Sequence, residues 1–487
     1  MLGHPHFDVL IIGVGLSGIG AAWHLQHFCP DRSYAILESR AAMGGTWDLF
    51  RYPGIRSDSD MYTLGYRFRP WRDAKAIADG PAIKRYIEET AREHGIDQKI
   101  RYGHRVVRAE WSSEEAHWKV QAEHDGVAVQ ITCGFLYCCT GYYDYEAGYT
   151  PDYPRMERYA GRFVHPQHWP SDLDYSGKRV VVIGSGATAV TLVPAMSMGP
   201  GAAAHVTMLQ RSPSYIAELP SQDIIADTLR RVLPSQAAYA ITRWKNVLMS
   251  MFFFLLARAA PGIFSRGLRK KARAALGAEY DVDKHFTPRY RPWDERLCII
   301  PDGDLFTALR EKRASIATDE IESFTPTGIQ LKSGEHLDAD IVVSATGLAL
   351  KLVGGMALVV DGTPVDIPRA MTYKGLMYSG VPNLASAFGY TNASWTLKCD
   401  LMAEHVCRLL NYMKEHGYVQ CMPVRDDSVG EQPVLNFTSG YVQRALPNLP
   451  KQGTRSPWRV HQNYLKDLVA FRHGRVDDPA LEFRRRK

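Results

Sequence analysis

Two glycine-rich turns of the same pattern stand out among the residues of this chain that could do chemistry. They read Gly13-x-Gly15-x-x-Gly18 and Gly184-x-Gly186-x-x-Ala189. Each follows an apolar run and opens a helical pattern, which is the context in which this spacing binds a dinucleotide. The glycines let the backbone turn tightly beside a pyrophosphate, which lies at the positive N-terminus of the following helix. The pair predicts two bound dinucleotides and electron transfer between them.

The residues that end the second strand of each unit predict different dinucleotides. Glu38 ends the strand that follows the first turn, where a carboxylate accepts hydrogen bonds from an adenosine ribose. The corresponding strand after the second turn ends in Arg211 and Ser212. An arginine there can bind a 2′-phosphate bidentately. We therefore expect an unphosphorylated ribose at the first turn and NADP rather than NAD at the second.

Neither a metal site nor a redox dithiol is expected. His165 and His168 are three residues apart, but no cysteine or acidic residue stands in register with them. None of the eight cysteines forms a CxxC pair, which argues against zinc and against a disulfide reductase with the same two-dinucleotide plan. Scattered thiols are typical of a reducing compartment, so we expect a cytoplasmic protein.

The elements that must position these turns indicate an α/β fold with two dinucleotide-binding, Rossmann-like domains. Strands over 7–12 and 34–38 and a helix over 16–28 build the first unit, and 105–133 alternates like an antiparallel meander. A separate strand over 135–139 leads into Thr-Gly, and 339–347 repeats that pattern. We take this repeat as the chain re-entering the first domain, so that the second domain is inserted into a discontinuous first one. The predicted boundaries are 1–150 and 336–487 for the first domain, 151–213 and 286–335 for the second, and 214–285 for a helical insertion.

Residues 247–257 form an apolar run of 11 residues with basic flanks, too short to span a bilayer. A buried helix of the insertion is one interpretation. Peripheral contact with the inner face of the cell membrane and a homo-oligomer interface are the others. The formal net charge is only +6 and no nucleic-acid-binding motif accompanies it, so a nucleic-acid partner is not expected.

A longer motif between the two turns resembles a known family. Tyr159-x-Gly161-x-x-x-His165-x-x-x-Trp169-Pro170 is similar to the Baeyer–Villiger monooxygenase fingerprint, with tyrosine in place of its phenylalanine. Together with GGTWDLFRYPGIRSDSDMYTLGYRF and GYTNASWTLK, it makes nearly the whole chain resemble bacterial Baeyer–Villiger monooxygenases of the ethionamide-activating type.

The resemblance implies an oxidoreductase with FAD at the first site, NADPH at the second and O2 as co-substrate. Such enzymes convert ketones to esters or lactones through a C4a-peroxyflavin, and oxygenate sulfides or thioamides as a secondary activity. A flavin monooxygenase that oxygenates only nitrogen or sulfur is the alternative within this class. A non-catalytic sensor of nicotinamide redox state is the alternative from another class.

The resemblance also implies roles for single residues. Arg296 stands where the family carries its catalytic arginine, and Asp58 matches the carboxylate beside it; His165 is expected to act as a hinge residue of the fingerprint. Some relatives place a lysine before the arginine to assist the 2′-phosphate, but this chain has Glu295 there. The residues expected to contact the cofactors are Gly13, Gly15, Ser17, Gly18, Glu38, Gly45, Thr46, Trp47, Arg56, Ser57, Asp58, Val106, Gly184, Ser185, Gly186, Ala187, Thr188, Ala189, Arg211 and Ser212.

Overall fold

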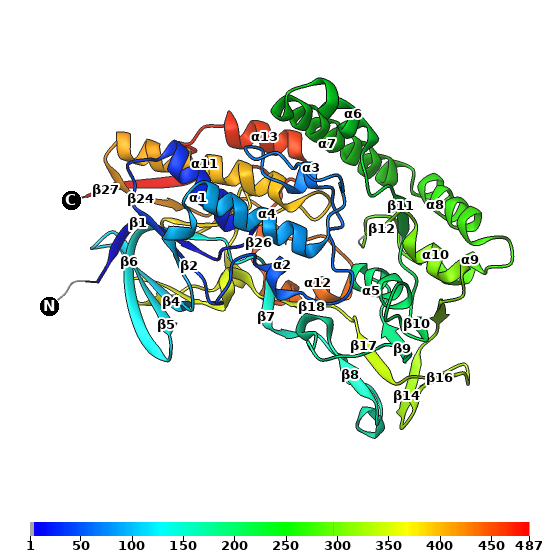
Figure 1. The fold of residues 1–487 in the computed structure, drawn as a ribbon. Helices are drawn as coiled ribbons and strands as arrows, with labels where there is room; N and C mark the ends of the chain where they lie inside the picture. Colours follow the sequence, from blue (N-terminus) through cyan, green and yellow to red (C-terminus); the bar gives the residue numbers. More distant parts are fainter. Residues whose placement is uncertain (1–3, 296, 487) are drawn as a thin grey trace.

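The computed structural model describes residues 4–295 and 297–486 of the chain. Two sheets organise the molecule, and the two termini lie on the side of the first sheet (Figure 1). The elements of the first segment are β1 (His6–Ile12), α1 (Leu16–Phe28), β2 (Tyr34–Leu37), α2 (Thr46–Leu49), α3 (Met61–Leu64), α4 (Gly80–Glu93), η1 (Asp97–Lys99), β3 (Ile100–Arg101), β4 (Arg105–Ser112), β5 (His117–His124), β6 (Val127–Cys138) and β7 (Tyr143–Gly148).

The second segment carries the second sheet and a group of helices. Its elements are η2 (Met156–Arg158), β8 (Arg162–Val164), η3 (Pro166–His168), β9 (Arg179–Ile183), α5 (Ala187–Ser197), β10 (His205–Gln210), β11 (Ile216–Leu219), α6 (Ile224–Val232), α7 (Ser235–Ala259), α8 (Pro261–Leu276), α9 (Val282–His285), β12 (Cys298–Pro301), α10 (Asp304–Arg310), β13 (Ala314–Thr318), β14 (Ile321–Thr325), β15 (Gly328–Leu331), β16 (His336–Asp338) and β17 (Ile341–Ser344).

The third segment returns to the first sheet. Its elements are β18 (Leu348–Leu350), η4 (Leu352–Gly355), β19 (Ala357–Val360), β20 (Thr363–Pro364), η5 (Ile367–Arg369), β21 (Thr372–Tyr373), β22 (Met377–Tyr378), β23 (Leu384–Ser386), α11 (Trp395–Glu415), β24 (Tyr418–Pro423), β25 (Glu431–Pro433), α12 (Gly440–Ala445), η6 (Leu446–Asn448), β26 (Lys451–Gly453), α13 (Tyr464–Arg472) and β27 (Leu481–Arg485).

The first sheet joins a parallel nucleotide-binding half to the antiparallel meander. Its strand order is β20-β19-β4-β5-β6-β1-β2-β3, with β23 also on β6. The predicted strand over 135–139 is not separate. It is the second half of the 12-residue strand β6, which runs antiparallel to β5 first and then parallel to β1. The continuous strand places the meander and the first glycine turn in one sheet, and α11 packs beside α1 over it.

The second sheet is wholly parallel, in the order β13-β10-β9-β17-β8. The sequence analysis interpreted 339–347 as the point where the chain re-enters the first domain. This interpretation is wrong for the strand in that segment, because β17 pairs with β9 of the second sheet. The two Thr-Gly repeats instead occupy equivalent places in the two sheets, each next to the strand before a glycine turn. The division into domains remains a prediction, and we place its last boundary after Ser344 rather than before 336.

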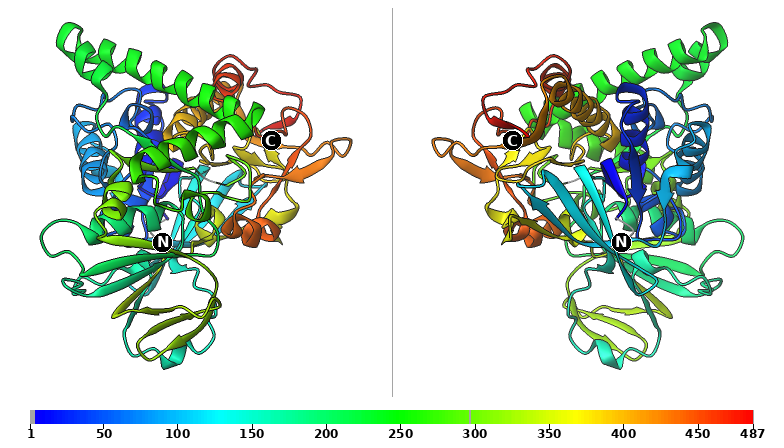
Figure 2. Two further views of the ribbon diagram at one scale, coloured as in Figure 1. Left: turned by 90° about the vertical axis from the view of Figure 1, so that its right-hand side faces the viewer. Right: turned by 90° about the vertical axis from the view of Figure 1, so that its left-hand side faces the viewer.

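The helical insertion forms a layer at the edge of the molecule, with α6 and α7 at the top of Figure 1 and α8 beyond them. Figure 2 shows α7 extending past the body as its longest outlying helix. The apolar run 247–257 is the second half of this 25-residue helix. Within the described residues, α7 alone has the length and apolar composition that could cross a membrane.

Candidate functional site

A cavity of about 600 Å³ lies between the first glycine turn and the start of α5, the helix that follows the second turn. Both nucleotide-binding units therefore face one space. The cofactor residues predicted from the sequence that line it are Gly13, Gly15, Ser17, Glu38, Gly45, Thr46, Trp47, Arg56, Ser57, Asp58, Val106, Ala187 and Thr188. Its lining does not include Gly18, Gly184, Ser185, Gly186, Ala189, Arg211 or Ser212. Arg296 lies outside the described residues.

The first turn fits a pyrophosphate closely. Gly13 has a φ of +99°, and a Cβ there would lie 2.6 Å from the carbonyl oxygen of Cys139. A Cβ at Gly18 would overlap the carbonyl of Gly13, so this glycine lets α1 approach the turn without itself lining the cavity. Gly15 precedes α1 and offers no side-chain cap, whereas Asp79 caps α4 through its carboxylate. The first amide groups of α1 are thus left for an anionic ligand.

Glu38 is held as an acceptor at the end of β2. Its two carboxylate oxygens accept hydrogen bonds from the amide groups of Val14 (3.1 Å) and Arg40 (2.9 Å). The side chain is 7% exposed. Burial raises the pKa of Glu38, against the lowering effect of the amides of Arg40 and Val14. The residue lines the cavity where the sequence predicts the ribose of the first dinucleotide.

The second turn is built in the same way. Gly184 has a φ of +135°, and a Cβ there would overlap the carbonyl oxygen of Ala345 after β17, as Gly13 would meet that of Cys139 after β6. Gly186 precedes α5 without a side-chain cap. The Ser185 hydroxyl donates to the carbonyl of Ser212 at 3.0 Å and so fixes the turn against the end of β10. A second dinucleotide fits this turn.

Arg211 is exposed and has an acidic neighbour. Burial raises the pKa of Glu295, while the charge of Arg211 lowers it and that of Asp294 raises it. The carboxylate that replaces the lysine of some relatives is therefore close enough to act on the arginine expected at the 2′-phosphate. Sequence reasoning identified both residues but could not place them together.

The loop between α2 and α3 connects the two units across the cavity. The guanidinium of Arg56 forms a two-pronged ion pair with Asp304 at the start of α10, with its second contact at 3.4 Å. Arg56, predicted to contact a cofactor, thus also joins the first unit to the second. Asp58 follows in the same loop and lines the cavity.

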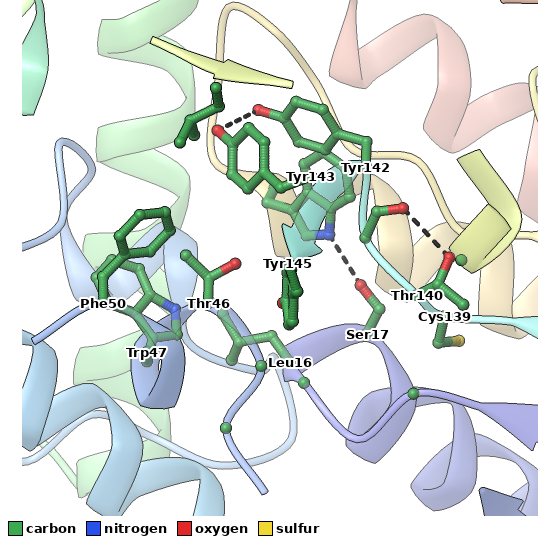
Figure 3. Close-up of a pocket in the computed structure, with 18 of the residues that line it drawn as sticks. Leu16, Ser17, Thr46, Trp47, Phe50, Cys139, Thr140, Tyr142, Tyr143 and Tyr145 are labelled. Carbon is green, nitrogen blue, oxygen red and sulfur yellow. Dashed lines mark hydrogen bonds between the residues drawn. The ribbon is translucent and has the colours of Figure 1, made fainter. Parts of the chain in front are cut away.

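Aromatic side chains that the sequence did not single out form one wall of the cavity (Figure 3). The Trp395 indole donates to the Ser17 hydroxyl at 2.8 Å, and the Tyr142 ring stacks on the indole at 5.0 Å. The Tyr142 and Tyr143 hydroxyls are hydrogen-bonded to each other at 2.7 Å. Tyr145 lies beside Thr46, and burial raises its pKa. Only Trp395 carried a signal, through its place in the GYTNASWTLK segment.

A buried polar network lies behind the same wall. The Tyr390 hydroxyl donates to a carboxylate oxygen of Asp467 at 2.7 Å, and the Lys398 ammonium is 3.5 Å from that oxygen. Lys398 is 1% exposed. Burial lowers its pKa, and burial raises the pKa of Asp467. Because Lys398 lies on α11 and Asp467 on α13, 69 positions apart in the chain, no local sequence pattern could have shown the pair.

The fingerprint lies where the chain passes between the two units. The Nε2 group of His165 donates to the carbonyl of Gly347 at 3.3 Å, and its Nδ1 accepts from the amide of Gln167 at 3.2 Å. Its ring fills the space beside Gly148, which pairs with Leu348 between β7 and β18. Burial lowers the pKa of His165, in keeping with this neutral arrangement. His165 thus contacts both connecting segments.

The other residues of the fingerprint pack and form hydrogen bonds within the connecting region. The hydroxyl of Tyr159, the departure from phenylalanine, donates to the carbonyl of Ala339 at 3.0 Å. A Cβ at Gly161 would lie 2.6 Å from the carbonyl oxygen of Asp340, which explains the glycine. Trp169 packs against the core of the second unit, and Pro170 follows it. The ring of His168 bonds the carbonyl of Glu146 at 3.2 Å.

Known proteins similar to this chain agree with the geometry of the site. Residues 76–224 match the model of the flavin-binding monooxygenase-like family. The FAD-containing monooxygenase EthA of Mycolicibacterium smegmatis is 54% identical over 479 residues, which cover 98% of this chain and 97% of that protein. A solved steroid monooxygenase bound to NADP superposes with a TM-score of 0.75 at 21% identity, covering 99% of this chain and all of that one. Cyclohexanone-bound cyclohexanone monooxygenase gives 0.77 at 17% identity with the same coverage.

The 54% identity over nearly the full length shows the family, and the solved structures show the fold. The predicted fold class, with one dinucleotide-binding domain inserted into the other, is confirmed. The chain therefore belongs to the family of FAD-containing monooxygenases and has the fold of the Baeyer–Villiger flavoprotein monooxygenases, as its fingerprint predicted.

Proposed function

We propose that this chain is an NADPH- and O2-dependent Baeyer–Villiger monooxygenase that converts ketones to esters or lactones, with oxygenation of sulfides or thioamides as a secondary activity. The observation that carries the proposal is the single cavity that Gly15 of the first turn and Thr188 of the second unit both line. A nicotinamide bound at the second turn can thereby reach a flavin held at the first. The fingerprint with His165 at the interdomain connection supports the Baeyer–Villiger assignment.

When bound, FAD supplies hydride acceptance from the nicotinamide and activation of O2. The chain holds the cofactor through the uncapped amides of α1 and through Glu38. Tyr142 and Trp395 stack on one another along this side of the cavity, where they would shield the bound cofactors from water. Exclusion of water strengthens the electrostatic interactions made with a developing oxyanion.

On the strength of the sequence resemblance, we assign to Arg296 the fixed positive charge that would stabilise the negative charge developing on the ketone oxygen. An arginine suits this role because it stays protonated and offers several donors. Asp58 on the cavity wall is the carboxylate proposed to orient it. Removal of one such donor lowers kcat by about 10²–10³ in other enzymes.

The test measures NADPH consumption in air with a panel of ketones and sulfides and identifies the products. We expect NADPH-dependent formation of an ester or lactone, with Arg296→Ala losing ester formation while flavin reduction by NADPH under anaerobic conditions persists. Oxygenated sulfide or amine products without any ester would replace this proposal with an enzyme restricted to sulfur and nitrogen. Binding of both cofactors with no turnover of any substrate would indicate a redox sensor.

A further inference from the structure

The outer side of the helical layer carries most of the exposed apolar surface. Of 17 large apolar side chains exposed among the described residues, 11 lie between positions 224 and 263, on α6, α7 and α8. On α7, Leu248 (52% exposed), Phe252 (61%) and Leu255 (56%) follow each other at helical spacing and form one stripe. We call this stripe, with the neighbouring Phe253, the apolar face. Scattered exposed apolar residues need no explanation, but a contiguous group marks an interaction surface.

The opposite side of α7 fixes the helix with this face outward. The buried guanidinium of Arg243 donates to the carbonyls of Tyr62 (2.7 Å) and Gly65 (2.8 Å). The Asn246 side chain donates to a carboxylate oxygen of Asp60 at 2.9 Å. Rotating α7 to bury the apolar face, or extending the helix across a bilayer, would leave these buried polar groups without partners, at a high free-energy cost. The helix therefore lies on the body and presents its apolar face outward.

The charge of the same layer identifies what the face meets. Residues 224–276 contain ten lysines and arginines and one acidic residue, Asp227. On α8, Ile263 is 63% exposed, and Arg266 and Lys270 follow it three and seven positions later on the same side. None of the ion pairs found among the described residues includes Arg266 or Lys270. An apolar stripe on α7 and cations on α8 that form no ion pair within the described part of the chain match an anionic lipid surface, where apolar side chains insert and cations contact phosphates.

A second copy of this chain fits the face poorly. Self-association through the layer would bring two surfaces with the same excess of positive charge together, and like charges at an interface cost binding free energy. An anionic membrane turns the same charge into attraction.

The inner side of α7 lies next to the residues that line the main cavity. Val247, Met251 and Phe254 line a small cavity together with Tyr390 and Ala393. Tyr390 and Ala393 also line the main cavity. The helix α7 therefore lies between the apolar face and the residues that line the main cavity.

We propose that the layer formed by α6, α7 and α8 docks on anionic lipid surfaces through the apolar face and the basic side of α8. An apolar substrate dissolved in the lipid then enters beside α7. This second part rests on the proposed function, whereas the docking does not.

The test is co-sedimentation of the FAD-loaded full chain with phosphatidylcholine vesicles, with and without phosphatidylglycerol, at low and high salt. We expect binding that requires phosphatidylglycerol and weakens with salt. Phe252→Ser with Phe253→Ser should weaken partitioning by at least about tenfold, because two aromatic side chains lose their burial in lipid. Arg266→Glu with Lys270→Glu should weaken it by about tenfold or more on the anionic vesicles only. Val127→Ser, which removes an equally exposed apolar side chain on β6, should bind like the wild type.

NADPH oxidation in the absence of vesicles checks that each variant is folded and keeps its cofactors, independently of lipid binding. Failure of the wild type to sediment with anionic vesicles, or sedimentation of the Phe252/Phe253 variant equal to wild type, would overturn the docking proposal. So would analytical ultracentrifugation that finds a dimer which the same variant converts to a monomer, because the face would then be an interface between copies. Loss of vesicle binding with unchanged ester formation from soluble ketones leaves the proposed function standing.

Discussion

Glu38 offers the sharpest test of how the first turn holds its cofactor. Each of its carboxylate oxygens accepts one amide hydrogen bond, from Val14 at 3.1 Å and from Arg40 at 2.9 Å. Glu38→Gln keeps the shape but replaces one oxygen with an NH2 group, which faces an amide donor and accepts nothing. The substitution also removes the charge that a ribose hydroxyl would meet.

The expected loss of affinity for FAD follows from the number of contacts that the substitution changes. One hydrogen bond to a charged group contributes about 1.5–3 kcal/mol, which corresponds to an increase of about 10- to 150-fold in the Kd of FAD. The assay is quenching of FAD fluorescence on titration of the apoprotein, with the affinity for NADPH as the internal control. Glu38→Asp keeps the charge and should lose less. An unchanged Kd for FAD in Glu38→Gln would refute the assignment of this residue to the ribose.

The pH dependence of the same titration has a defined sign. Burial raises the pKa of Glu38 in the unliganded protein, and hydroxyl donors of a ribose favour its ionised form. Affinity for FAD should therefore increase as pH rises through that raised pKa, by about tenfold per pH unit at most, and level off above it. The stability of the apoprotein should change in the opposite direction, because a raised carboxyl pKa stabilises the native state at low pH and that contribution is lost as pH rises. Glu38→Gln should abolish both trends.

Three further substitutions follow from the structure. Arg211→Ala should raise KM for NADPH by about 10- to 100-fold, with a much smaller effect on KM for NADH, because a charge-assisted contact to the 2′-phosphate is lost. Glu295→Gln should lower KM for NADPH. If steady-state kinetics show equal effects on the two nucleotides, Arg211 does not bind the 2′-phosphate. Lys398→Met should destabilise the protein by about 3–5 kcal/mol because it leaves Asp467 buried without its cation. Combining Lys398→Met with Asp467→Asn should restore much of the lost unfolding free energy, measured by urea unfolding followed by flavin fluorescence. No recovery in the double variant would contradict the pairing. Gly161→Ala should lower the thermal midpoint, because its Cβ would meet the carbonyl of Asp340, and a midpoint equal to wild type would show that the strand can shift.

Local sequence pattern determined the two nucleotide-binding units. The first helix begins and ends where it was predicted, at 16 and 28, and the two strands of the first unit were placed to within one residue. Apolar runs, glycine spacing and the acid or arginine at the strand end all act over short distances along the chain. The fingerprint then identified the family, which the comparisons confirmed.

Only the tertiary structure decided which distant segments meet. It joined the meander to the nucleotide sheet through β6, assigned β17 to the second sheet, and brought Lys398 to Asp467 and Arg211 near Glu295. Each of these pairings joins separate segments of the chain through packing or charge, and such partners leave no periodic signal in either segment. For the two glycine turns, the sequence determined that each binds a dinucleotide, while the packing of the two units determined that the first turn and the start of α5 line one cavity.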